Sequence, residues 1–537
     1  MGDLIHEGRR RSLVVGRSLF DYADDLAVVV PASCKRTGRC RECVVEVKAG
    51  LDELSPRTGP EGFLRDPYRL ACQASVVGAD EDMEIAVLRR RLRIVTRASG
   101  DVPHPDPVVV REGTAVLYRG EPIDEWRGAI RGVAIDVGTT TIAWELCDLE
   151  SGDVLHVGAI ENPQRFGGSD VISRISYDTG PERGELRQAV RKALNHELRA
   201  AYRDLAIDRR TVYEVVVVGN ATMRDLFFGL DVTPIGVRPF RSVIETAYRA
   251  GERDTTSIVA LAHELGIFVN PRARIVGGPL IGSHVGADVG ADLVAVGFAD
   301  GPDPAMLIDV GTNTEVVVRA GDRYLAASCP AGPAFEGGSV RNGMTASEGA
   351  IEAVRMRDGR IEYDTIGDVD PEGICGSGLV DLLAELTRAG VMTPEGRFAD
   401  GSREIDIAPA QGIAFSRADA SALAQAKAAN HCGTGILLRL LGLESGAIRR
   451  LYLAGAFASY IDIGNAVDIG FIPPIPERRI EKVGNASLRG ARIMLLSASR
   501  RAALDRLVGR IEHVELETHP DFFDLFVEGC RFAPIAV

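Results

Sequence analysis

The sequence predicts an α/β fold that is duplicated along the chain and preceded by a small domain rich in β-strands. The first observation is a pattern that occurs twice: residues 132–141 read G-V-A-I-D-V-G-T-T-T, and residues 305–314 read A-M-L-I-D-V-G-T-N-T. Each copy is an apolar run typical of a buried strand, followed by Asp, Gly and small polar side chains. The second observation is that four of the nine cysteines fall within the first hundred residues. We therefore expect a small cysteine-bearing domain followed by two related halves.

Each copy of this pattern has the chemistry of a phosphate-binding turn. Glycine allows a positive φ and a close approach of a ligand to the backbone, and outward N–H groups cradle phosphate. A carboxylate such as Asp136 or Asp309 can hold Mg²⁺ through water. A single copy is more readily explained as an ordinary strand-to-turn corner, but two copies indicate two halves that clamp one nucleotide. The expected nucleotide contacts in these turns are Gly138, Thr139, Thr140, Thr141, Gly311, Thr312 and Asn313.

Length and composition exclude several classes of protein. A chain of 537 residues predicts two to four domains. No apolar run approaches the roughly 18 residues of a membrane-spanning helix, so we expect no membrane partner. The formal net charge of −14 argues against general nucleic-acid binding. Residues 9–11 are arginines, as in a twin-arginine signal, but charged residues follow at once in place of an apolar core, so we expect a cytoplasmic protein.

The charge and the cysteines are unevenly distributed. Residues 1–100 hold 17 Lys and Arg against 15 Asp and Glu, a net charge of +2, so the remainder carries −16. An odd number of cysteines in a large chain without a signal sequence disfavours a disulfide framework. The five cysteines outside the first hundred residues are expected to be dispensable for any cluster, although Cys375 could face the cleft between the halves.

The first domain is expected over residues 1–95, with strands at residues 12–15, 27–30 and 44–47. Cys34, Cys40 and Cys43 lie on one loop, and Cys72 follows 29 residues later. Three thiolates on a loop plus one remote thiolate are what a [2Fe–2S] cluster needs. Zinc is the alternative, but structural zinc sites usually use two short-spaced pairs of ligands.

The cysteine loop resembles those of the plant and adrenodoxin-type ferredoxins, and its five-residue first gap is closer to the adrenodoxin type. These families place glycines around the cysteines, whereas this chain keeps only Gly38 and has Lys35, Arg36, Arg39 and Arg41 at the neighbouring positions. The positive charge is expected to raise the reduction potential of a cluster. It could also guide the cluster onto an acidic surface of a partner or of this chain, or the four residues could be ordinary solvated charges.

Residues 96–130 are expected to be a semi-rigid linker with at most one short strand, because prolines alternate with polar residues at its start. The first half of the duplicated fold follows over residues 131–300. In it, Leu186, Val190, Leu194 and Leu198 recur every four residues and predict a helix with one apolar face. Residues 215–223 read V-V-V-V-G-N-A-T-M, a buried strand and a turn that lines the cleft or is simply a tight turn.

The second half is expected over residues 301–537. Residues 373–378 read G-I-C-G-S-G before an apolar helix, and a glycine-rich turn at a helix N-terminus attracts anions, so Gly376, Ser377 and Gly378 are candidate ligands. Ser416 and Asp419 form a predicted capping box for an alanine-rich helix.

Three further segments of this half complete the predicted site. The alanine-rich helix carries Lys427, a candidate nucleotide ligand. Residues 451–457 read L-Y-L-A-G-A-F, which suits an adenosine face at Gly455 and Ala456. Glu336, in C-P-A-G-P-A-F-E-G-G, either orients the attacking water as a catalytic group or is a structural carboxylate.

Residues 132–530 together resemble the ATP-dependent reductive activators of corrinoid proteins, which belong to the actin, sugar-kinase and heat-shock-chaperone superfamily. The segments D-V-G-T-N-T-E, A-G-P-A-F-E-G, G-I-C-G-S-G, L-A-G-A-F and G-N-A-S-L-R-G-A occur in that family's order. The resemblance implies a duplicated actin-like, ribonuclease H-like ATPase fold with an N-terminal β-grasp ferredoxin-like α+β domain. Two departures are Ala458, where the family usually has Gly, and a short linker, which predicts that the middle domain of longer members is missing.

The resemblance also implies a function. A corrinoid carrier works through Co(I), and its oxidation to Co(II) inactivates it. The expected activity is ATP-dependent one-electron reduction of a Co(II) corrinoid protein or methyltransferase, with a [2Fe–2S] cluster, ATP and Mg²⁺ as cofactors. An upstream low-potential reductant supplies the electron, and a homodimer is an open possibility.

Three alternatives remain at this point. They are a small-molecule kinase fused to a ferredoxin, an activator of 2-hydroxyacyl-CoA dehydratases, and a filament-forming relative of actin. The dehydratase activators share one [4Fe–4S] cluster between two subunits through cysteines of the ATPase domain, whereas here four cysteines lie together in a separate domain.

Overall fold

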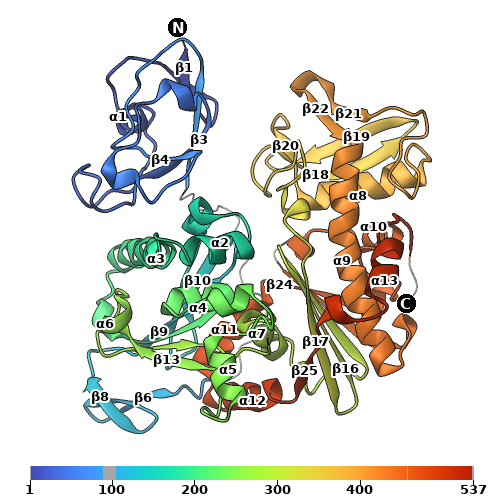
Figure 1. The fold of residues 1–537 in the computed structure, drawn as a ribbon. Helices are drawn as coiled ribbons and strands as arrows, with labels where there is room; N and C mark the ends of the chain where they lie inside the picture. The colour runs from blue at the N-terminus through green and yellow to red at the C-terminus, as the bar shows by residue number, and fades with distance from the viewer. Residues whose placement is uncertain (1, 89–103, 283, 456, 535–537) are drawn as a thin grey trace.

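A computed structural model describes residues 2–88, 104–282, 284–455 and 457–534. Figure 1 shows two α/β lobes side by side, with the N-terminal domain standing above the first lobe and a smaller group of strands above the second. Within the described residues, no helix has the length and apolar character needed to cross a membrane.

The N-terminal domain is a five-stranded mixed sheet in the order β2-β1-β5-β3-β4. Its elements are β1 (Asp3–His6), β2 (Arg9–Ser12), α1 (Leu19–Asp25), β3 (Val44–Ala49), β4 (Tyr68–Leu70) and β5 (Met83–Val87). Helix α1 begins at a capping box formed by Ser18 and Asp21. The predicted strand at residues 44–47 is confirmed, but the one at 12–15 is wrong beyond Ser12. The one at 27–30 is also wrong, because Ala27 has a left-handed φ of 55° and Val30 enters the core from a loop.

Residues 109–125 form a three-stranded antiparallel sheet in place of the expected linker with at most one strand. Its strands are β6 (Val109–Glu112), β7 (Ala115–Tyr118) and β8 (Glu121–Glu125). Gly113 and Gly120 turn the chain between them with positive φ values of 59° and 83°. The sheet lies at the far end of the first lobe from the N-terminal domain (Figure 1). Residues 89–103, where the first domain was expected to end, lie outside the described residues.

The two lobes are built on six-stranded sheets with matching topology. The first has the order β11-β10-β9-β12-β14-β13 and the second the order β24-β23-β15-β16-β17-β25. Five strands of each sheet match: three successive antiparallel strands (β9 to β11, or β15 to β17) lie beside two parallel strands (β12 and β14, or β23 and β24). The sixth strands differ, because β13 pairs antiparallel with β14 at one edge, whereas β25 pairs parallel with β17 at the opposite edge. The strands of the first sheet are β9 (Arg131–Val137), β10 (Thr141–Asp148), β11 (Val154–Glu161), β12 (Val212–Val218), β13 (Ile258–Leu261) and β14 (Arg274–Gly277). Those of the second are β15 (Ala305–Val310), β16 (Thr314–Ala320), β17 (Arg323–Cys329), β23 (Arg450–Ala454), β24 (Ile480–Gly484) and β25 (Ile511–His513). The predicted duplication is therefore confirmed.

Helices cover both sheets, so the central strands are continuous apolar runs. All seven residues of β12 are buried, which explains why this segment shows no polar alternation. The first-lobe helices are α2 (Val171–Asp178), α3 (Glu185–Asp204), α4 (Ala221–Phe228), α5 (Val243–Arg249), α6 (Ala262–Leu265) and α7 (Ala287–Ala295). The predicted apolar face of residues 186–198 is buried on α3.

The helices that follow β17 are α8 (Gly376–Arg388), α9 (Arg417–Leu441), α10 (Ile463–Asp468), α11 (Ala486–Leu496), α12 (Ala498–Val508) and α13 (Phe522–Gly529). The capping box of Ser416 and Asp419 starts α9, as predicted.

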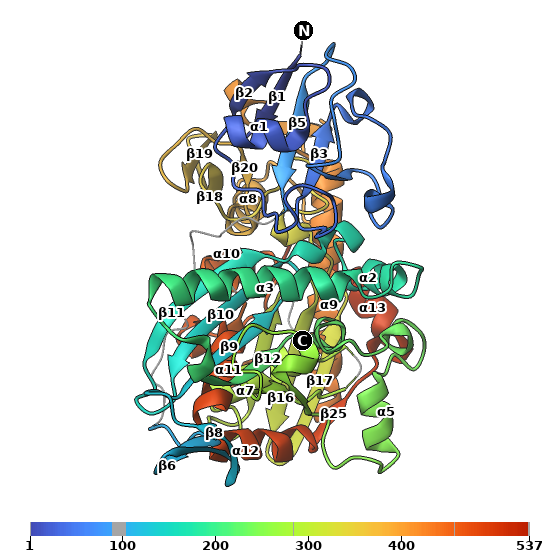
Figure 2. The same cartoon turned by 90° about the vertical axis from the view of Figure 1, so that its left-hand side faces the viewer.

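A group of strands inserted between β17 and α9 stands above the second lobe. It contains a three-stranded sheet of β18 (Ala350–Arg357), β19 (Arg360–Thr365) and β20 (Gly373–Ile374), and a hairpin of β21 (Glu404–Ala408) and β22 (Ile413–Ser416). In Figure 2, the N-terminal domain lies above the long helix α3, and the inserted strands lie behind the N-terminal domain.

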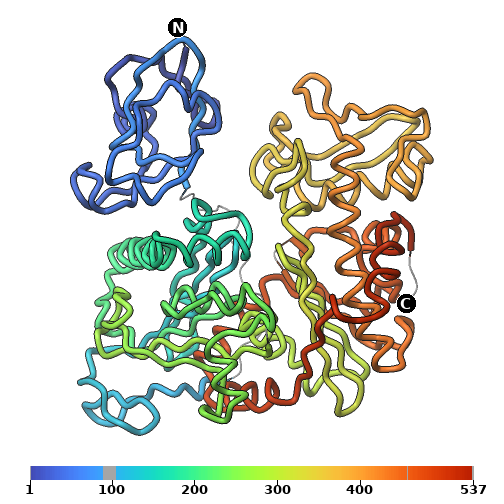
Figure 3. Tube along the Cα trace, viewed as in Figure 1, coloured from blue at the N-terminus to red at the C-terminus, as the bar shows by residue number. Residues whose placement is uncertain are grey.

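The chain returns to the first lobe near its C-terminus. Helix α11 packs against α7 and against β9, β10 and β12, and α12 continues along the same lobe. The red segment can be followed into the first lobe in Figure 3. The structure therefore differs from the expectation of two halves that are each continuous in sequence.

Helix α11 approaches α7 most closely at Gly490. We therefore expect Gly490→Ala to lower the free energy of unfolding by about 3 kcal/mol. A Cβ there would lie 2.0 Å from the carbonyl oxygen of Ala291 in α7, and backbone atoms have little freedom to move away. This overlap outweighs the gain of about 1 kcal/mol from replacing glycine within a helix. Denaturant unfolding would measure the change.

The matched control is Gly446→Ala, because a Cβ at Gly446 meets no atom within 4 Å. We expect this control to change stability by less than about 0.5 kcal/mol. Equal stability of both variants would contradict close packing of α11 on α7.

Candidate functional site

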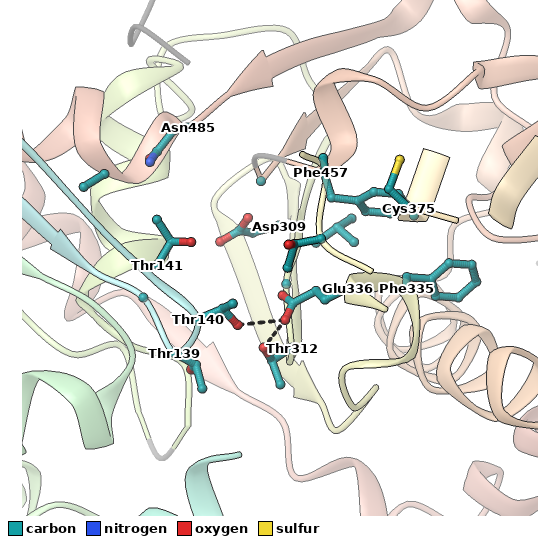
Figure 4. A pocket seen from close by; sticks show the side chains of 18 of the residues that line it. Thr139, Thr140, Thr141, Asp309, Thr312, Phe335, Glu336, Cys375, Phe457 and Asn485 are labelled. Atoms are coloured by element: carbon teal, nitrogen blue, oxygen red, sulfur yellow. Dashed lines mark hydrogen bonds between the residues drawn. The ribbon is translucent and has the colours of Figure 1, made fainter. Parts of the chain in front are cut away.

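A cavity of about 360 Å³ lies between the two lobes, where the turns β9–β10 and β15–β16 face each other. This volume is within the range of small-molecule sites. The other walls come from the segment before and including Glu336, the N-terminus of α8, the turn after β23 and the N-terminus of α11 (Figure 4). All seven predicted nucleotide-contacting residues of the two turns line this cavity. The repeated pattern therefore brings its polar residues to one place.

Glu336 joins the two turns. The hydroxyl groups of Thr140 and Thr312 both donate to Glu336 Oε2, over 2.9 and 2.8 Å (Figure 4). Burial raises the pKa of the Glu336 carboxyl, and the two threonine hydrogen bonds partly oppose this effect. One carboxylate oxygen thus bonds to the turns of both lobes at the cavity. These contacts give Glu336 a structural role, and its predicted role in orienting water stays a prediction.

Seven carboxylates line the cavity, and four of them lie close enough to influence one another: Asp136, Asp288, Asp309 and Glu315. Burial is the largest cause of their raised pKa values, and neighbouring carboxylates add to it at Asp136, which reaches about 8, and at Asp288, which reaches about 7. Burial also raises the pKa of Asp309, to about 6, and that of Glu315 well above its usual value. No Lys, Arg or His is found among the described residues that line the cavity. The negative charge therefore favours binding of an external cation.

The carboxylates do not surround a single point as direct ligands. Throughout the described ranges, no three His, Cys, Asp or Glu side chains form a direct metal-binding group. Mg²⁺ usually keeps several waters and uses one or two protein carboxylates, so this arrangement suits an ion held partly through water. The amide of Asn485, at the start of α11, donates to Asp136 Oδ2 over 3.3 Å and orients this carboxylate.

The first phosphate turn is supported from behind by two asparagines. Asn162 Nδ2 donates to the carbonyl of Gly138 over 2.8 Å, and Asn220 Nδ2 donates to Thr139 Oγ1 over 3.1 Å. Asn220 also caps α4 through its side-chain oxygen and lines the cavity. Of the two interpretations of residues 215–223, the cleft-lining one is confirmed.

The glycine-rich turn at α8 contributes only part of its predicted ligands. Gly376 and Ser377 line the cavity, as does Cys375, whose thiol donates to the carbonyl of Ile351. Gly378 was predicted wrongly. It lies within α8 against β18, where a Cβ would be 2.3 Å from the carbonyl oxygen of Ile351, so its small size serves packing.

The turn after β23 forms another wall. Gly455 lines the cavity with φ of 101°, and a Cβ there would lie 2.3 Å from the carbonyl oxygen of Val310. This close approach requires glycine. Ala456, also a predicted ligand, lies outside the described residues. Phe457 lines the cavity and stacks on Phe335 at 6.0 Å between ring centroids, which gives this side of the cavity an apolar surface suited to a flat ring.

Lys427 is the second wrong prediction among the candidate ligands. It is fully buried in α9, does not line the cavity, and donates to the carbonyls of Gly529 and Arg531, the latter over 2.7 Å. Burial lowers the pKa of its amine to about 7. Lys427 therefore anchors the C-terminal end of α13 and has no contact with the candidate nucleotide site.

Asp288, Glu315 and Asn485 were not predicted. A signal existed for Glu315, because it is the cross-strand partner of Asp309 in the β15–β16 hairpin and partners in a hairpin share a face. Asn485 lies in the quoted segment G-N-A-S-L-R-G-A, but that pattern gives no direction for the side chain. Asp288 has no recognisable pattern around it.

The four N-terminal cysteines come together in two pairs. The Cys43 thiol donates to Cys72 Sγ over 3.4 Å, and the thiols of Cys34 and Cys40 are also hydrogen-bonded. Two pairs of thiols match a two-iron cluster, in which two cysteines bind each iron. The donor set therefore fits the predicted [2Fe–2S] group.

The cysteine loop has left-handed backbone at several non-glycine positions. Lys35, Arg36 and Arg41 have φ values of 54°, 64° and 57°, which side chains rarely adopt. These are three of the four positively charged residues that replace the glycines of related ferredoxins. Arg36 forms an ion pair with Asp24, and Arg41 pairs with Glu185 on α3 of the first lobe. Arg41 thus meets an acidic residue of this chain's own first lobe.

Three family models match consecutive parts of the chain. A model described as a 2Fe-2S iron-sulfur cluster binding domain matches residues 4–77, and one described as the RACo middle region matches residues 131–300. A third, described as the C-terminal domain of RACo, the ASKHA domain, matches residues 303–535. The chain is 32% identical over 438 residues to the corrinoid activation enzyme RamQ of Eubacterium limosum, a match that covers 76% of this chain and 72% of RamQ. The chain belongs to the family of corrinoid activation enzymes.

Two other similarities agree with this family of corrinoid activation enzymes. A [Co(II) methylated amine-specific corrinoid protein] reductase of Methanosarcina barkeri is 25% identical over 422 residues, which cover 74% of this chain and 76% of the reductase. A solved structure of a reductive activator for corrinoid, iron-sulfur protein has a TM-score of 0.70 at 26% identity, covering 99% of this chain and 98% of that one. The resemblance and the fold class predicted from the sequence are confirmed.

The family models also bear on two narrower questions. The iron–sulfur model includes all four clustered cysteines, which supports the [2Fe–2S] cluster over the zinc alternative. The middle-region model matches residues 131–300, the part expected as the first half of the duplicated fold, so the absence of a further middle domain found in longer members stays a prediction.

We expect Lys427→Met to leave nucleotide affinity unchanged and to lower the free energy of unfolding by about 1–3 kcal/mol, since two buried carbonyls lose their donor. Isothermal titration calorimetry and denaturant unfolding would measure the two quantities. Thr312→Val is the matched comparison, because its hydroxyl faces the cavity, and it should weaken nucleotide binding. Loss of nucleotide affinity in a folded Lys427→Met protein would restore Lys427 as a ligand.

Proposed function

We propose that this chain reactivates a corrinoid protein by ATP-dependent one-electron reduction of its cobalt from Co(II) to Co(I). The observation that carries the proposal is the combination of two sites in one chain. One is a group of four cysteines matched by an iron–sulfur domain model, and the other is an inter-lobe cavity lined by the two glycine- and threonine-bearing turns and by a cluster of carboxylates. The names of the matched relatives, a corrinoid activation enzyme and a corrinoid protein reductase, support the same activity.

In this proposal the N-terminal domain accepts one electron and transfers it to the corrinoid protein. Cys34, Cys40, Cys43 and Cys72 hold a [2Fe–2S] cluster, which supplies one-electron redox chemistry when bound. A low-potential reductant delivers the electron, and the corrinoid protein, as the substrate, accepts it and changes from Co(II) to Co(I). This step involves one electron and breaks no bond within the protein.

The cavity between the lobes binds and hydrolyses ATP. The backbone and hydroxyl groups of the two turns bind the phosphates, while Asp136 and Asp309 orient Mg²⁺ through water. Phe457 and Gly455 provide the face for adenosine. Because Thr140 and Thr312 come from different lobes, phosphates bound between them favour one arrangement of the lobes over another.

ATP is needed because the electron transfer to cobalt is uphill. Each 59 mV of unfavourable one-electron potential lowers the equilibrium yield of Co(I) about tenfold. A nucleotide can offset this only if it binds differently to the lobe arrangements that precede and follow transfer. The lobe contact through Glu336 is a place where such a difference can arise.

The direct test follows Co(I) formation by its absorbance when the protein, a Co(II) corrinoid protein, a reductant and ATP are mixed. We expect Asp309→Asn to retain the cluster spectrum but to lose ATP hydrolysis and Co(I) formation by about a hundredfold or more, because the Mg²⁺ that stabilises the phosphate charge loses one of the carboxylates that hold it. The reciprocal control is Cys43→Ser, which should hydrolyse ATP without forming Co(I). Wild-type Co(I) formation by Asp309→Asn would refute the ATP-dependent mechanism.

The raised carboxylate pKa values predict that Mg²⁺ stabilises the protein more strongly at higher pH. Asp136, Asp288 and Asp309 have folded pKa values of about 8, 7 and 6, above the roughly 3.9 of an unfolded Asp. Folding therefore favours their protonated forms, and this stabilisation is present below about pH 4 and lost as pH rises through about 8. Bound Mg²⁺ neutralises the negative charge that these carboxylates gain when they lose their protons at higher pH.

Thermal unfolding with and without Mg²⁺ at pH 6 and pH 8.5 would measure this effect. The gain in Tm from Mg²⁺ should be larger at pH 8.5 in the wild type and should shrink in an Asp136→Asn, Asp309→Asn double variant. An equal gain at both pH values, or one unaffected by the two substitutions, would count against a cation site at these carboxylates.

A further inference from the structure

Helix α3 of the first lobe touches the cysteine loop directly. Lys192 Nζ donates to the carbonyl of Cys40 over 2.7 Å and to Gln188 Oε1 over 2.7 Å. About two turns before Lys192 on the same helix, Glu185 pairs with Arg41 of the loop. Figures 1 and 2 both place the N-terminal domain above α2 and α3. A cation of the ATPase half is therefore bound to the backbone of a candidate cluster ligand.

Other contacts hold the N-terminal domain in this arrangement, which we call the docked arrangement. Phe63 packs edge-on against Phe166 with ring centroids 5.6 Å apart, and the Tyr177 hydroxyl of α2 donates to the Phe63 carbonyl. Arg165 reaches Glu46 of β3 over 3.3 Å. Contacts from three separate segments of the first lobe define one orientation of the cysteine loop on α3.

We propose that Lys192 is a positioning residue of the ATPase half that raises the reduction potential of the cluster in the docked arrangement. This inference rests on the proposed function, because it requires the [2Fe–2S] cluster. Reduction adds one negative charge to a cluster already ligated by thiolates, and a nearby ammonium stabilises that charge. Both hydrogen-bond partners of Lys192 named above are neutral oxygens, so neither cancels its charge.

Lys192 differs from the other cations near the cluster in where it is attached. Lys35, Arg36, Arg39 and Arg41 are part of the loop and stay beside the cluster wherever the domain moves. Lys192 belongs to α3, so its charge acts on the cluster only while the domain is docked. Separation of the domain from α3 removes this charge and lowers the potential.

Thermodynamic linkage makes the effect reciprocal. If docking favours the reduced cluster, reduction strengthens docking by the same factor. A tenfold difference in docking between the reduced and oxidised forms corresponds to 59 mV for one electron. The docked cluster then accepts an electron more easily, and the undocked cluster is the stronger reductant that Co(II) requires.

The test is a redox titration of the full-length, cluster-loaded protein, monitored by electron paramagnetic resonance. Lys192→Met should lower the midpoint potential, and a tenfold weaker preference for the reduced form would appear as a fall of 59 mV. Lys192→Gln keeps a hydrogen-bond donor without the charge and should lower the potential similarly. Lys192→Arg keeps the charge and should stay close to wild type.

Lys482→Met is the matched control. Lys482 also donates from its amine to a backbone carbonyl, that of Ile461 over 2.6 Å, but it lies on β24 of the second lobe. Its removal should leave the midpoint potential unchanged. This control separates a local effect at the cysteine loop from a general change in the protein's charge.

Iron and sulfide analysis and circular dichroism on each variant make every outcome decisive. An unchanged potential in cluster-loaded, folded Lys192→Met and Lys192→Gln would overturn the proposal for Lys192 and leave the proposed function intact. Wild-type protein that contains zinc and no sulfide would instead refute the cluster and, with it, the proposed function. If Lys192→Met does not fold, Lys192→Gln decides the question.

Discussion

The cavity between the lobes concentrates negative charge with no basic side chain among its described lining residues, and this constraint shapes the rest of the site. Asp136 and Asp309 end equivalent strands of the duplicated fold, so the duplication itself places them face to face. Their charges are tolerated because strands with mostly buried residues hold them and because protons or cations can neutralise them. Amide and hydroxyl donors, rather than lysine or arginine, then orient the carboxylates. This arrangement fits the proposed binding of a nucleotide together with a divalent cation.

The parts of this site that follow from short-range pattern could be predicted from the sequence. The strand, glycine and threonine of each phosphate turn are adjacent in the chain, and the Cys34–Cys43 loop is equally local. Glu336 was found because it lies in a glycine-rich segment. Its bridging role could not be predicted, because that depends on Thr140, nearly two hundred residues away in the chain.

The errors have identifiable physical causes. An alanine-rich helix pattern predicts α9 but not which of its faces meets the cavity, so Lys427 was misplaced. In G-I-C-G-S-G, Gly376 lines the cavity, whereas Gly378 allows close packing of α8 against β18. The sequence alone does not show which glycine has which role. The return of α11 to the first lobe depends on long-range packing at Gly490. Left-handed Lys35, Arg36 and Arg41 oppose the usual preference for glycine, so no residue-level rule predicts them.

The return of α11 and α12 to the first lobe also determines how the molecule can move. Within the described residues the chain crosses between lobes three times: after α7, at Asn485 between β24 and α11, and between α12 and β25. The last two crossings are only one or two residues long. Two short connections between the lobes resist sliding of one lobe past the other but permit rotation about the line that joins the connections. Because Asn485 also donates to Asp136, one connection between the lobes is bonded to a carboxylate that lines the inter-lobe cavity.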